Sequence, residues 1–543
     1  MLRVIFWLSF AAVGLYYEWG SALVSIALLV YLARKKQLTL RLNPAFLAAA
    51  AITLFYAVGW LWAVDSGVAA WGGVKHLPVL LFALCLMQEE KDARLRLLRD
   101  IPWMGAAMVL LTFPLQFVPL FSRMFSVSGR LAGLFQYPNT FACFLLLGLE
   151  VLLLEREKPT WRRLGCGILV LFGLLQTGSR AVLVMTLPLL LVCLLLRKDK
   201  KTALWALAGG AVAAALAFGV TALGVGGADR VTEVTGEAST LLGRLLYWKD
   251  ALPQILRHPL GLGYLGYYFT QGSFQTGVYS VRWAHNDLVQ LLLDVGWLPA
   301  IAAVWAAVQS LLSRRVCALR RMVLLTLLGH CMFDFDLQFA AMYFIVLLCL
   351  DWEGGKEKRL QLKKALSVPA AAVLSALCLW IGATSTLSYE GYPDTALKLW
   401  PWDTFSRMTQ LQQIEDAAAL DTAAQQILQQ NGSVALAWDA RALAAYARGD
   451  FGAMMEYKRQ AIALSRYTPE TYIDYFHRLQ MGVSLYTQAG DTASAAICQK
   501  EILAIDSMVR QVLDETDPLA WRIADKPELE LPAEYYNYIA ALQ

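Results

Sequence analysis

The chain has 543 residues, of which 58% are hydrophobic and 16% are charged, and its mean hydropathy is +0.49. A soluble globular protein is excluded, because apolar runs of bilayer length recur from the N-terminus to about residue 388. The net charge of +5 requires no nucleic-acid partner, since basic residues gather in the connections between apolar runs. The runs are typical of helices and not of alternating barrel strands, so we predict an all-α, polytopic membrane protein.

In chain order, the hydropathy pattern predicts about 12–13 membrane-spanning helices. They are expected at residues 4–17, 20–33, 44–64, 68–87, 101–121, 131–154, 164–179, 181–196, 202–225, 286–310, 322–333, 338–350 and 366–388. The first two form a short hairpin around Glu18. The N-terminus has bulky residues where a small-residue cleavage site would lie, so we expect it to remain as an anchor.

Basic residues cluster in every second connection between the predicted spans. The clusters lie around residues 34–41, 91–99, 156–163, 197–201, 314–321 and 356–364. The positive-inside rule makes these connections cytoplasmic in a multi-pass protein of the cytoplasmic membrane. The loop at 226–285, the turns at Asp65, Arg130 and Arg180, and the chain after residue 388 are then extracytoplasmic. The stretch QEEKDARLRLLRD is a candidate amphipathic helix on anionic membrane lipid.

The composition changes after residue 388 and predicts three regions. Residues 1–388 form a multi-spanning domain with the large exported loop 226–285, residues 389–415 form a linker rich in Pro and aromatic residues, and residues 416–543 form a soluble helical domain. Within the last region, AAYARGDFGAMMEYKRQAIAL aligns loosely with SLYTQAGDTASAAICQKEILAI. This pattern resembles tetratricopeptide helix pairs, and a plain helical bundle is the alternative. We expect this domain to dock a protein partner or a polymer.

The cysteines argue against a structural metal, a haem or a disulfide framework. The nine cysteines include no CxxC spacing, and all except Cys498 lie in or beside apolar segments. A free thiol in such a place behaves as a small hydrophobic group.

Four ionisable residues are predicted at the outer membrane face, where charges are costly unless they serve a site. They are Arg130, Arg180, Arg244 and His285. Arginine forks onto phosphate oxygens and is always charged, so converging guanidinium groups suit a lipid-linked pyrophosphate. The alternative for each arginine is that it extends to lipid headgroups without any role in a site.

His285 is the candidate general base, because a histidine near neutrality can accept a proton from a sugar hydroxyl. Its neighbour Asn286 is expected to orient the ring or a substrate hydroxyl, and both residues have helix capping as the alternative. The Tyr137-Pro138-Asn139 sequence predicts a bent or interrupted helix, and Asn139 is therefore a candidate cavity-lining residue.

Four segments in a fixed order carry a family resemblance. They are GRLAGLFQYPNTFA, TGSRAVLV, GRLLYWKDAL followed by HPLGLGYLGYYF, and AHNDLVQLLLDVGWL. Together they resemble the O-antigen ligase and O-antigen polymerase superfamily over roughly residues 40–350. The resemblance implies transfer of a polyprenyl-pyrophosphate-linked glycan to a glycan, lipid or protein acceptor on the outer face, with no cofactor and no metal.

The resemblance also implies roles for individual residues. Arg180 and Arg244 would hold the pyrophosphate leaving group, and His285 would activate the acceptor hydroxyl for inverting displacement. Trp248 completes the Arg-x-x-x-Trp pattern that begins at Arg244, and Arg130 matches less closely. These residues, with Asn139 and Asn286, are the predicted site.

Several alternatives remain open at this point. Asp334-Phe335-Asp336 is either a metal site for a diphosphate or a polar pair that breaks a helix. A ligase and a repeat-unit polymerase need the same groups, and we favour the ligase because the exported tail could recruit an acceptor. A transporter would place charges at mid-membrane depth, and a scaffold would act through the tail alone.

Overall fold

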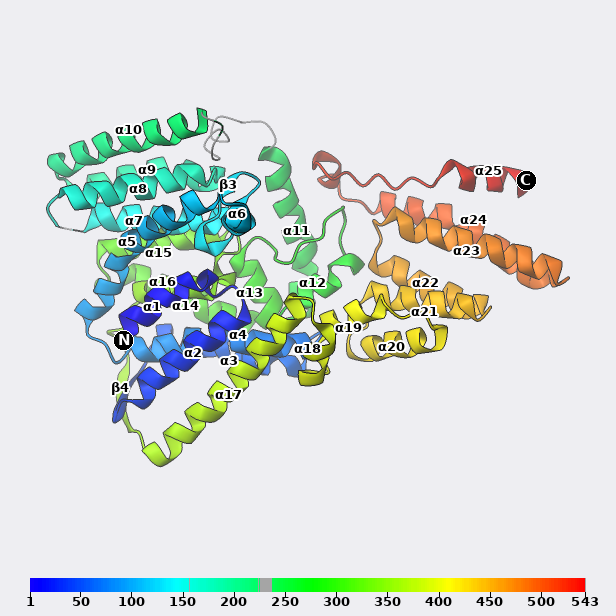
Figure 1. Cartoon of the computed structure of the whole chain (residues 1–543), viewed down its shortest axis with the longest axis horizontal. Coiled ribbons are helices and arrows are strands. Elements are labelled where there is room, and N and C mark those ends of the chain that lie inside the picture. The colour runs from blue at the N-terminus through cyan, green and yellow to red at the C-terminus, as the bar shows by residue number, and fades with distance from the viewer. Residues whose placement is uncertain (156, 223, 225–236, 543) are drawn as a thin grey trace. The chain divides into compact units, whose positions relative to one another are not determined.

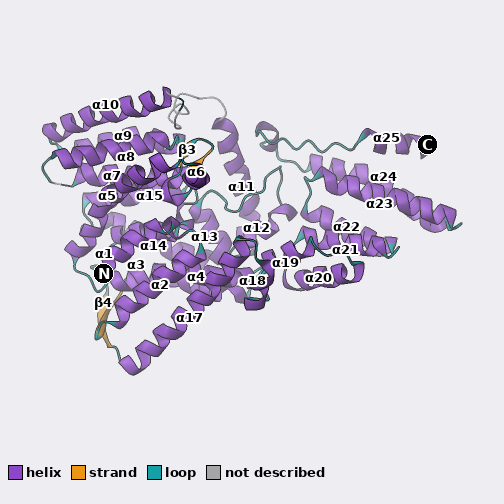
Figure 2. Cartoon of the chain, in the orientation of Figure 1, coloured by secondary structure: helices purple, strands orange, loops and turns teal. Residues whose placement is uncertain are grey.

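The computed structural model describes residues 1–155, 157–222, 224 and 237–542, and α-helices form most of this chain (Figure 1). Figure 2 shows that strands are few and short. The α-helices are α1 (Leu2–Ala11), α2 (Glu18–Ala33), α3 (Pro44–Val58), α4 (Ser66–Leu86), α5 (Lys91–Leu115), α6 (Pro119–Phe125), α7 (Pro138–Leu154), α8 (Trp161–Gln176), α9 (Arg180–Arg197), α10 (Lys200–Ala222), α11 (Glu237–Arg257), α12 (Gly266–Thr270), α13 (Asp287–Val295), α14 (Trp297–Leu312), α15 (Ala318–Cys331), α16 (Ala340–Cys349), α17 (Lys364–Tyr389), α18 (Pro393–Leu399), α19 (Thr404–Leu411), α20 (Ala417–Gln430), α21 (Ala435–Ala447), α22 (Phe451–Leu464), α23 (Pro469–Gln488), α24 (Thr492–Asp514) and α25 (Ala533–Leu542). The all-α prediction is confirmed.

The chain divides into two compact units. Unit 1 comprises Met1–Val58, Trp71–Thr235 and His285–Thr386, and unit 2 comprises Gly59–Ala70, Gly236–Ala284 and Leu387–Gln543. Unit 2 therefore contains residues 237–284 of the predicted exported loop together with the C-terminal tail, whereas His285 lies in unit 1. Residues 226–236 of that loop lie outside the described residues.

Five helical segments within the described residues are long and apolar enough to cross a membrane. They are Pro44–Leu61, Ser66–Leu86, Arg180–Arg197, Lys200–Ala222 and Lys364–Tyr389. The shorter apolar helices are Leu2–Ala11, Glu18–Ala33, Pro138–Leu154, Trp297–Leu312 and Ala340–Cys349. A multi-spanning membrane protein is supported, and the predicted number of spans stays a prediction.

The predicted N-terminal hairpin is present in unit 1. Helices α1 and α2 are joined through the 3-10 helix η1 (Val13–Leu15), in which Gly14 has a positive φ of 59°. A side chain there would lie 2.8 Å from the ring of Phe135, so a glycine suits both the backbone and the space. The two ends of the hairpin meet, because Arg34 Nη1 lies 3.3 Å from the Met1 sulfur.

Connections that the charge pattern places in the cytoplasm contact one another in unit 1. Strand β1 (Gln37–Leu42) pairs antiparallel with β4 (Lys356–Gln361), and Arg41 Nη2 lies 3.0 Å from a Glu357 carboxylate oxygen. Further ion pairs between these connections are Arg94–Glu353 and Arg99–Glu155, and Arg163–Glu155 lies within one of them. Segments that touch in this way are expected to share one side of a membrane.

Three predicted spans have boundaries that the structure corrects. The span predicted at 286–310 is two helices, α13 and α14, because Gly296 adopts a φ of 76° that only glycine takes readily. The span predicted at 101–121 falls on α5, which begins earlier, at Lys91, because the charged stretch continues the same helix, and ends at Leu115. The span predicted at 131–154 begins at Pro138, where proline occupies the first helical turn and lacks the N–H that would be unpaired there.

Helix α7 lies in the core of unit 1 and positions the site described below. It packs against α5, α8, α9 and α15, and its residues from Thr140 to Leu152 are buried throughout. Short strands β2 (Ser126–Val127) and β3 (Arg130–Leu131) and the 3-10 helix η3 (Gly133–Phe135) precede it. An apolar helix that is buried on all faces keeps its N-terminal residues fixed.

In unit 2, the tail contains two helix pairs with the same connection. Gly449 and Gly490 both have positive φ, and the next residues, Asp450 and Asp491, cap α22 and α24 through their side chains. In both turns the Asp N–H returns to a carbonyl of the preceding helix, at 3.0 Å and 2.9 Å. The helical character of the tail is confirmed, whereas its assignment to tetratricopeptide repeats stays a prediction.

Candidate functional site

A buried carboxylate, Asp334, organises a polar cluster in unit 1. Asp334 follows α15 and is 1% exposed. Its Oδ1 accepts hydrogen bonds from Tyr137 Oη at 2.9 Å and from the Phe335 N–H at 2.9 Å, and its Oδ2 accepts from Asn139 Nδ2 at 2.8 Å. The break at Tyr137-Pro138-Asn139 therefore serves to present two donors from the start of α7 to this carboxylate.

His285 lies beside this carboxylate. Its Nδ1 is 3.4 Å from Asp334 Oδ1, its side chain is 23% exposed, and its ring lies edge-on to Phe335 at 5.0 Å. The residue has a φ of 50°, in the left-handed region that a histidine rarely adopts. Strained conformations of this kind persist where the surrounding contacts enforce them. An oriented, partly exposed imidazole next to a buried carboxylate is suited to proton transfer.

Arg130 extends the cluster from β3. Its Nε donates to the Thr177 carbonyl oxygen at 2.8 Å, and its Nη2 donates to Asn139 Oδ1 at 2.6 Å. Asn139 thus accepts from a guanidinium and donates to a carboxylate, which links the charges of Arg130 and Asp334. The structure brings together three residues that the sequence predicted separately, Arg130, Asn139 and His285.

Asn286 is the N-cap of α13, so the capping role considered from the sequence is present. Its Oδ1 accepts from the N–H groups of Leu288 and Val289 at 3.0 and 3.1 Å, and its Nδ2 donates to the Met332 carbonyl at 3.0 Å. These contacts fix the backbone that follows His285. Asn286 is 3% exposed, and its contacts in the structure cap α13 and fix this segment.

The two carboxylates of Asp334-Phe335-Asp336 serve different networks. Asp336 is fully buried, and it accepts from Thr140 Oγ1 at 2.7 Å and lies 2.5 Å from His330 Nδ1. Sequence reasoning did not place Asp334 in the site, although it singled out this Asp-x-Asp motif. The motif alone does not indicate that Asp334 contacts Asn139, which lies 195 positions earlier in the sequence.

Two buried groups among the described residues have donor atoms close enough for a metal. They are Cys143, His330 and Asp336, and Asp287, Cys331 and Asp336, with ligand atoms within 4.8 Å of one another. Asp336 belongs to both groups and is already bound by Thr140 and His330. We assign no ion to these residues.

Arg180 is the first residue of α9 and is partly buried. It follows a turn in which Gly178 has a φ of 56° and in which the Thr177 carbonyl accepts from Arg130. The same turn therefore connects Arg130 to the start of α9, within unit 1.

Arg244 and Trp248 lie on α11 of unit 2, four residues apart and thus on one face of the helix. Trp248 Nε1 donates to the carbonyl oxygen of Ala284 at 2.8 Å. Ala284 is the residue before His285, so this bond fixes the end of the loop segment.

The tail holds α11 within unit 2. Lys249 pairs with Asp517, and the Asp517 N–H donates to the Thr276 carbonyl at 2.9 Å. Leu246 packs with Tyr279 and Ala520 in a small apolar cluster. Burial tends to raise the pKa of Asp517, but the hydrogen bond and charge of Lys249 outweigh it, so this pKa lies below its ordinary value.

Next to this ion pair, Asp250 fixes the loop that precedes Ala284. It accepts from the Thr276 N–H at 2.8 Å, from Thr276 Oγ1 at 2.7 Å and from Tyr279 Oη at 2.8 Å. Burial raises the pKa of Asp250, although these hydrogen bonds act in the opposite direction. Unit 2 therefore has a rigid connection from the tail through α11 to the end of the loop.

Comparison with known proteins identifies one part of the chain. Residues 165–304 match the family model described as O-antigen ligase, a range that includes Arg180, Arg244, Trp248, His285 and Asn286. No curated protein and no solved structure matches the chain. The resemblance that the sequence motifs predicted is confirmed over the matched segment, and Arg130, Asn139 and Asp334 lie outside it. Residues 165–304 of this chain are similar to the O-antigen ligase family.

Proposed function

We propose that the protein transfers a glycan from a polyprenyl-pyrophosphate carrier to an acceptor hydroxyl at the outer face of the cytoplasmic membrane. The observation that carries this proposal is the His285–Asp334 pair, in which the imidazole Nδ1 lies 3.4 Å from a buried carboxylate oxygen. His285 lies within the segment that matches the O-antigen ligase family model, and Asp334 lies outside that segment.

In the proposed reaction His285 removes the proton from the acceptor hydroxyl. Asp334 orients the ring and stabilises the imidazolium that forms, in the way a buried carboxylate supports a catalytic histidine elsewhere. The hydroxyl oxygen attacks the anomeric carbon from the face opposite the leaving group. The new C–O bond forms as the bond to the pyrophosphate oxygen breaks, so the anomeric configuration inverts.

The leaving group takes both electrons of the broken bond, and negative charge develops on its phosphate oxygens. Arg180 and Arg244 are the groups we assign to this charge, because a guanidinium forms two parallel hydrogen bonds to phosphate. Such preorganised donors lower the barrier most when they act on charge that appears in the transition state. We therefore assign no metal to the transfer step.

The outer-face location is supported by contacts inside unit 2. Asp65 lies in the turn between the candidate spans Pro44–Leu61 and Ser66–Leu86. It accepts from Thr404 Oγ1 at 2.5 Å and from Asn431 Nδ2 at 3.0 Å, and the Gly67 carbonyl accepts from Trp400 Nε1 at 3.1 Å. The tail and this turn thus share a side, and the charge pattern makes that side extracytoplasmic.

A single transfer to an acceptor and repeated joining of repeat units would use the same groups. We favour single transfer, since the tail packs on α11 and adds a large extracytoplasmic surface that an acceptor could occupy. The acceptor could be a protein, a lipid or a glycan, because this surface does not specify its chemical class.

The test uses purified protein in lipid vesicles with a lipid-pyrophosphate-linked oligosaccharide, with and without added acceptor. A single product of increased size that requires the acceptor supports the ligase, and a ladder of products without acceptor supports the polymerase. The Asp334→Asn variant is assayed beside the wild-type protein. It keeps the size of the side chain and removes its charge, so it tests whether product formation requires the carboxylate. No product in either condition from folded protein would contradict the proposal.

A further inference from the structure

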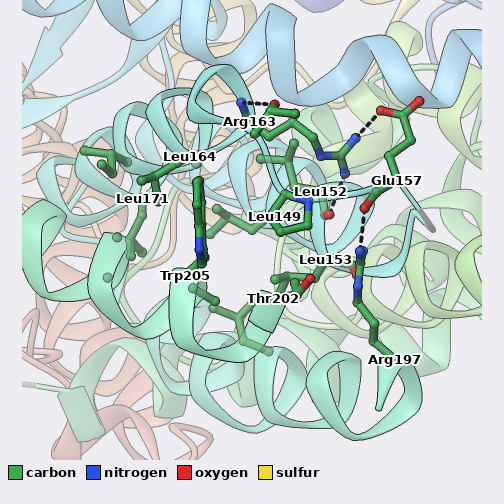
Figure 3. A pocket seen from close by; sticks show the side chains of 18 residues that line it. Leu149, Leu152, Leu153, Glu157, Arg163, Leu164, Leu171, Arg197, Thr202 and Trp205 are labelled. Carbon is green, nitrogen blue, oxygen red and sulfur yellow. Dashed lines mark hydrogen bonds and ion pairs between the residues drawn. The ribbon is translucent and has the colours of Figure 1, made fainter. Parts of the chain in front are cut away.

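A cavity lies among α7, α8, α9 and α10 in unit 1 (Figure 3). The cavity has a volume of about 110 Å³. Leu149 and Leu152 of α7, Leu171 of α8, Leu190 of α9 and Trp205 of α10 line its apolar part.

Glycines keep this cavity open. A side chain at Gly167 of α8 would first meet Leu152 at 3.7 Å, and one at Gly210 of α10 would first meet Leu171 at 3.9 Å. Both positions line the cavity and leave room for added carbon atoms. The space therefore persists because two facing helices lack side chains there.

The surroundings of the cavity are apolar. The most hydrophobic windows of α9 and α10 are only 17% buried within the protein, and Val184 and Leu187 of α9 are 76% and 78% exposed. Such faces are stable only against lipid. Water is disfavoured in an apolar cavity that offers it few hydrogen bonds, so hydrocarbon is the natural occupant.

One end of the cavity is polar, and the side chains around it mark the level of lipid headgroups. Trp161 at the start of α8 and Trp205 in the second turn of α10 pack at 4.8 Å between ring centroids, and tryptophans concentrate at the membrane interface. Figure 3 shows Arg163 and Arg197 at the same end as Glu157. Arg163 binds the Glu157 carboxylate at 2.8 Å, and Arg197 binds the Glu157 carbonyl at 2.5 Å, so both guanidinium groups hold the cavity wall.

Further basic residues around this end are exposed and give it a positive charge. They are Lys158, Arg162, Lys198, Lys200 and Lys201, against the acidic side chains of Glu157 and Asp199. A basic surface beside a gap between membrane helices attracts anionic headgroups.

We propose that this cavity binds one acyl chain of a membrane phospholipid, with an anionic headgroup held at the basic end. The chain would lie along Leu149, Leu171 and Trp205, and the headgroup phosphate would lie near Lys200 and Lys201. The apolar wall favours a hydrocarbon chain, and the exposed lysines favour a negatively charged headgroup. This site is separate from the His285–Asp334 cluster and does not depend on the proposed transferase function.

The experiment is native mass spectrometry of the full chain in detergent, titrated with phosphatidylglycerol or with phosphatidylcholine of the same acyl chains. We expect the wild-type protein to retain phosphatidylglycerol about tenfold more strongly than phosphatidylcholine. Gly210→Leu fills the cavity and is expected to weaken retention of both lipids by at least about tenfold. Gly219→Leu is the matched control, because the same change on α10 meets no atom within 4 Å.

Two further variants keep the test decisive. Gly167→Leu fills the cavity from α8, so it replaces Gly210→Leu if that variant does not fold. Lys200→Gln with Lys201→Gln is expected to abolish the preference for phosphatidylglycerol and leave phosphatidylcholine retention unchanged. Equal retention of the two lipids by the wild-type protein, or unchanged retention in both glycine variants, would overturn the proposal.

Discussion

Asp334 Oδ1 lies 3.4 Å from His285 Nδ1, in a position that hydrogen bonds from Tyr137 and Asn139 at the start of α7 determine. The carboxylate is 1% exposed, so its charge requires the hydrogen bonds that it receives. This arrangement couples the start of α7 to the residue that we propose as the base. The polar cluster is therefore one network, in which each member limits the positions of the others.

The first prediction concerns the charge of this carboxylate. Asp334→Asn places an amide donor opposite Asn139 Nδ2, which is itself a donor, and it removes the negative charge beside His285. We expect turnover to fall by about 10²-fold or more. We also expect a loss of about 1–3 kcal/mol in the free energy of unfolding, because a buried donor then lacks its acceptor. Thermal unfolding and transfer assays measure the two effects.

The second prediction separates the structural role of this pair from its catalytic role. The double variant Asp334→Asn with Asn139→Asp restores one donor and one acceptor, and it moves the charge toward Arg130. We expect the free energy of unfolding to recover by about 1 kcal/mol or more relative to the single variant, with no recovery of turnover. Recovery of both would mean that the charge next to His285 is not needed for the reaction.

The third prediction concerns the attachment of α11 to the tail. Asp517→Ala removes the partner of Lys249 and leaves Asp250 in place. Lys249 is exposed, but Asp517 is buried and also accepts from the Leu519 N–H at 2.8 Å, so we expect the free energy of unfolding to fall by about 1–2 kcal/mol. We expect faster amide hydrogen exchange in α11 and a decrease in turnover, since Arg244 would be less well positioned. Hydrogen exchange that is unchanged over α11 would argue against a positioning role for the tail.

The fourth prediction gives the pH dependence of the same ion pair. The pKa of Asp517 is lowered in the folded protein, so the pair stabilises the fold above the unfolded-state pKa of about 3.9. The stabilisation is lost as the pH falls through the lower, folded-state pKa. Lys249→Met should therefore destabilise unit 2 at neutral pH and have no effect at strongly acidic pH. An effect of the same size at both extremes would exclude this explanation.

The fifth prediction tests the contact between the tail and the turn at Asp65. Thr404→Val removes one donor to a carboxylate that is 1% exposed, while Gln430 and Asn431 still donate to it. We expect a loss of about 1–2 kcal/mol in the free energy of unfolding. Thr422→Val is a suitable control, because Thr422 Oγ1 donates only to a carbonyl of its own helix, α20, at 2.9 Å. Equal losses in the two variants would contradict a specific role for the Asp65 contact.

Much of the fold followed from hydrophobic patterns and basic clusters. Apolar runs predicted helices such as α4, α9 and α17 within a few residues, because a long apolar helix has few other stable states in lipid. The break at Gly296 was missed, since a glycine in an apolar run is tolerated in many helices. The early start of α5 was missed because its first turns are charged and were assigned to the interface instead.

The site was predicted residue by residue but without its central group. His285, Arg130 and Asn139 were identified by their unusual chemistry at the outer face, whereas Asp334 is separated from Asn139 by 195 positions in the sequence. Only the packing of α15 against α7 brings these residues together. A local motif cannot indicate such a pairing, and the Asp-x-Asp sequence was compatible with either a metal site or a polar pair that breaks a helix.

The most direct test of the central claim measures donor binding and turnover separately in His285→Ala and Arg244→Ala. If His285 is the base and Arg244 holds the pyrophosphate, His285→Ala should bind the lipid-linked donor normally and lose turnover by at least about 10²-fold. Arg244→Ala should bind the donor about 10–100-fold more weakly, because it lacks a charge-assisted hydrogen bond. Full turnover in both variants, with folding intact, would contradict the account.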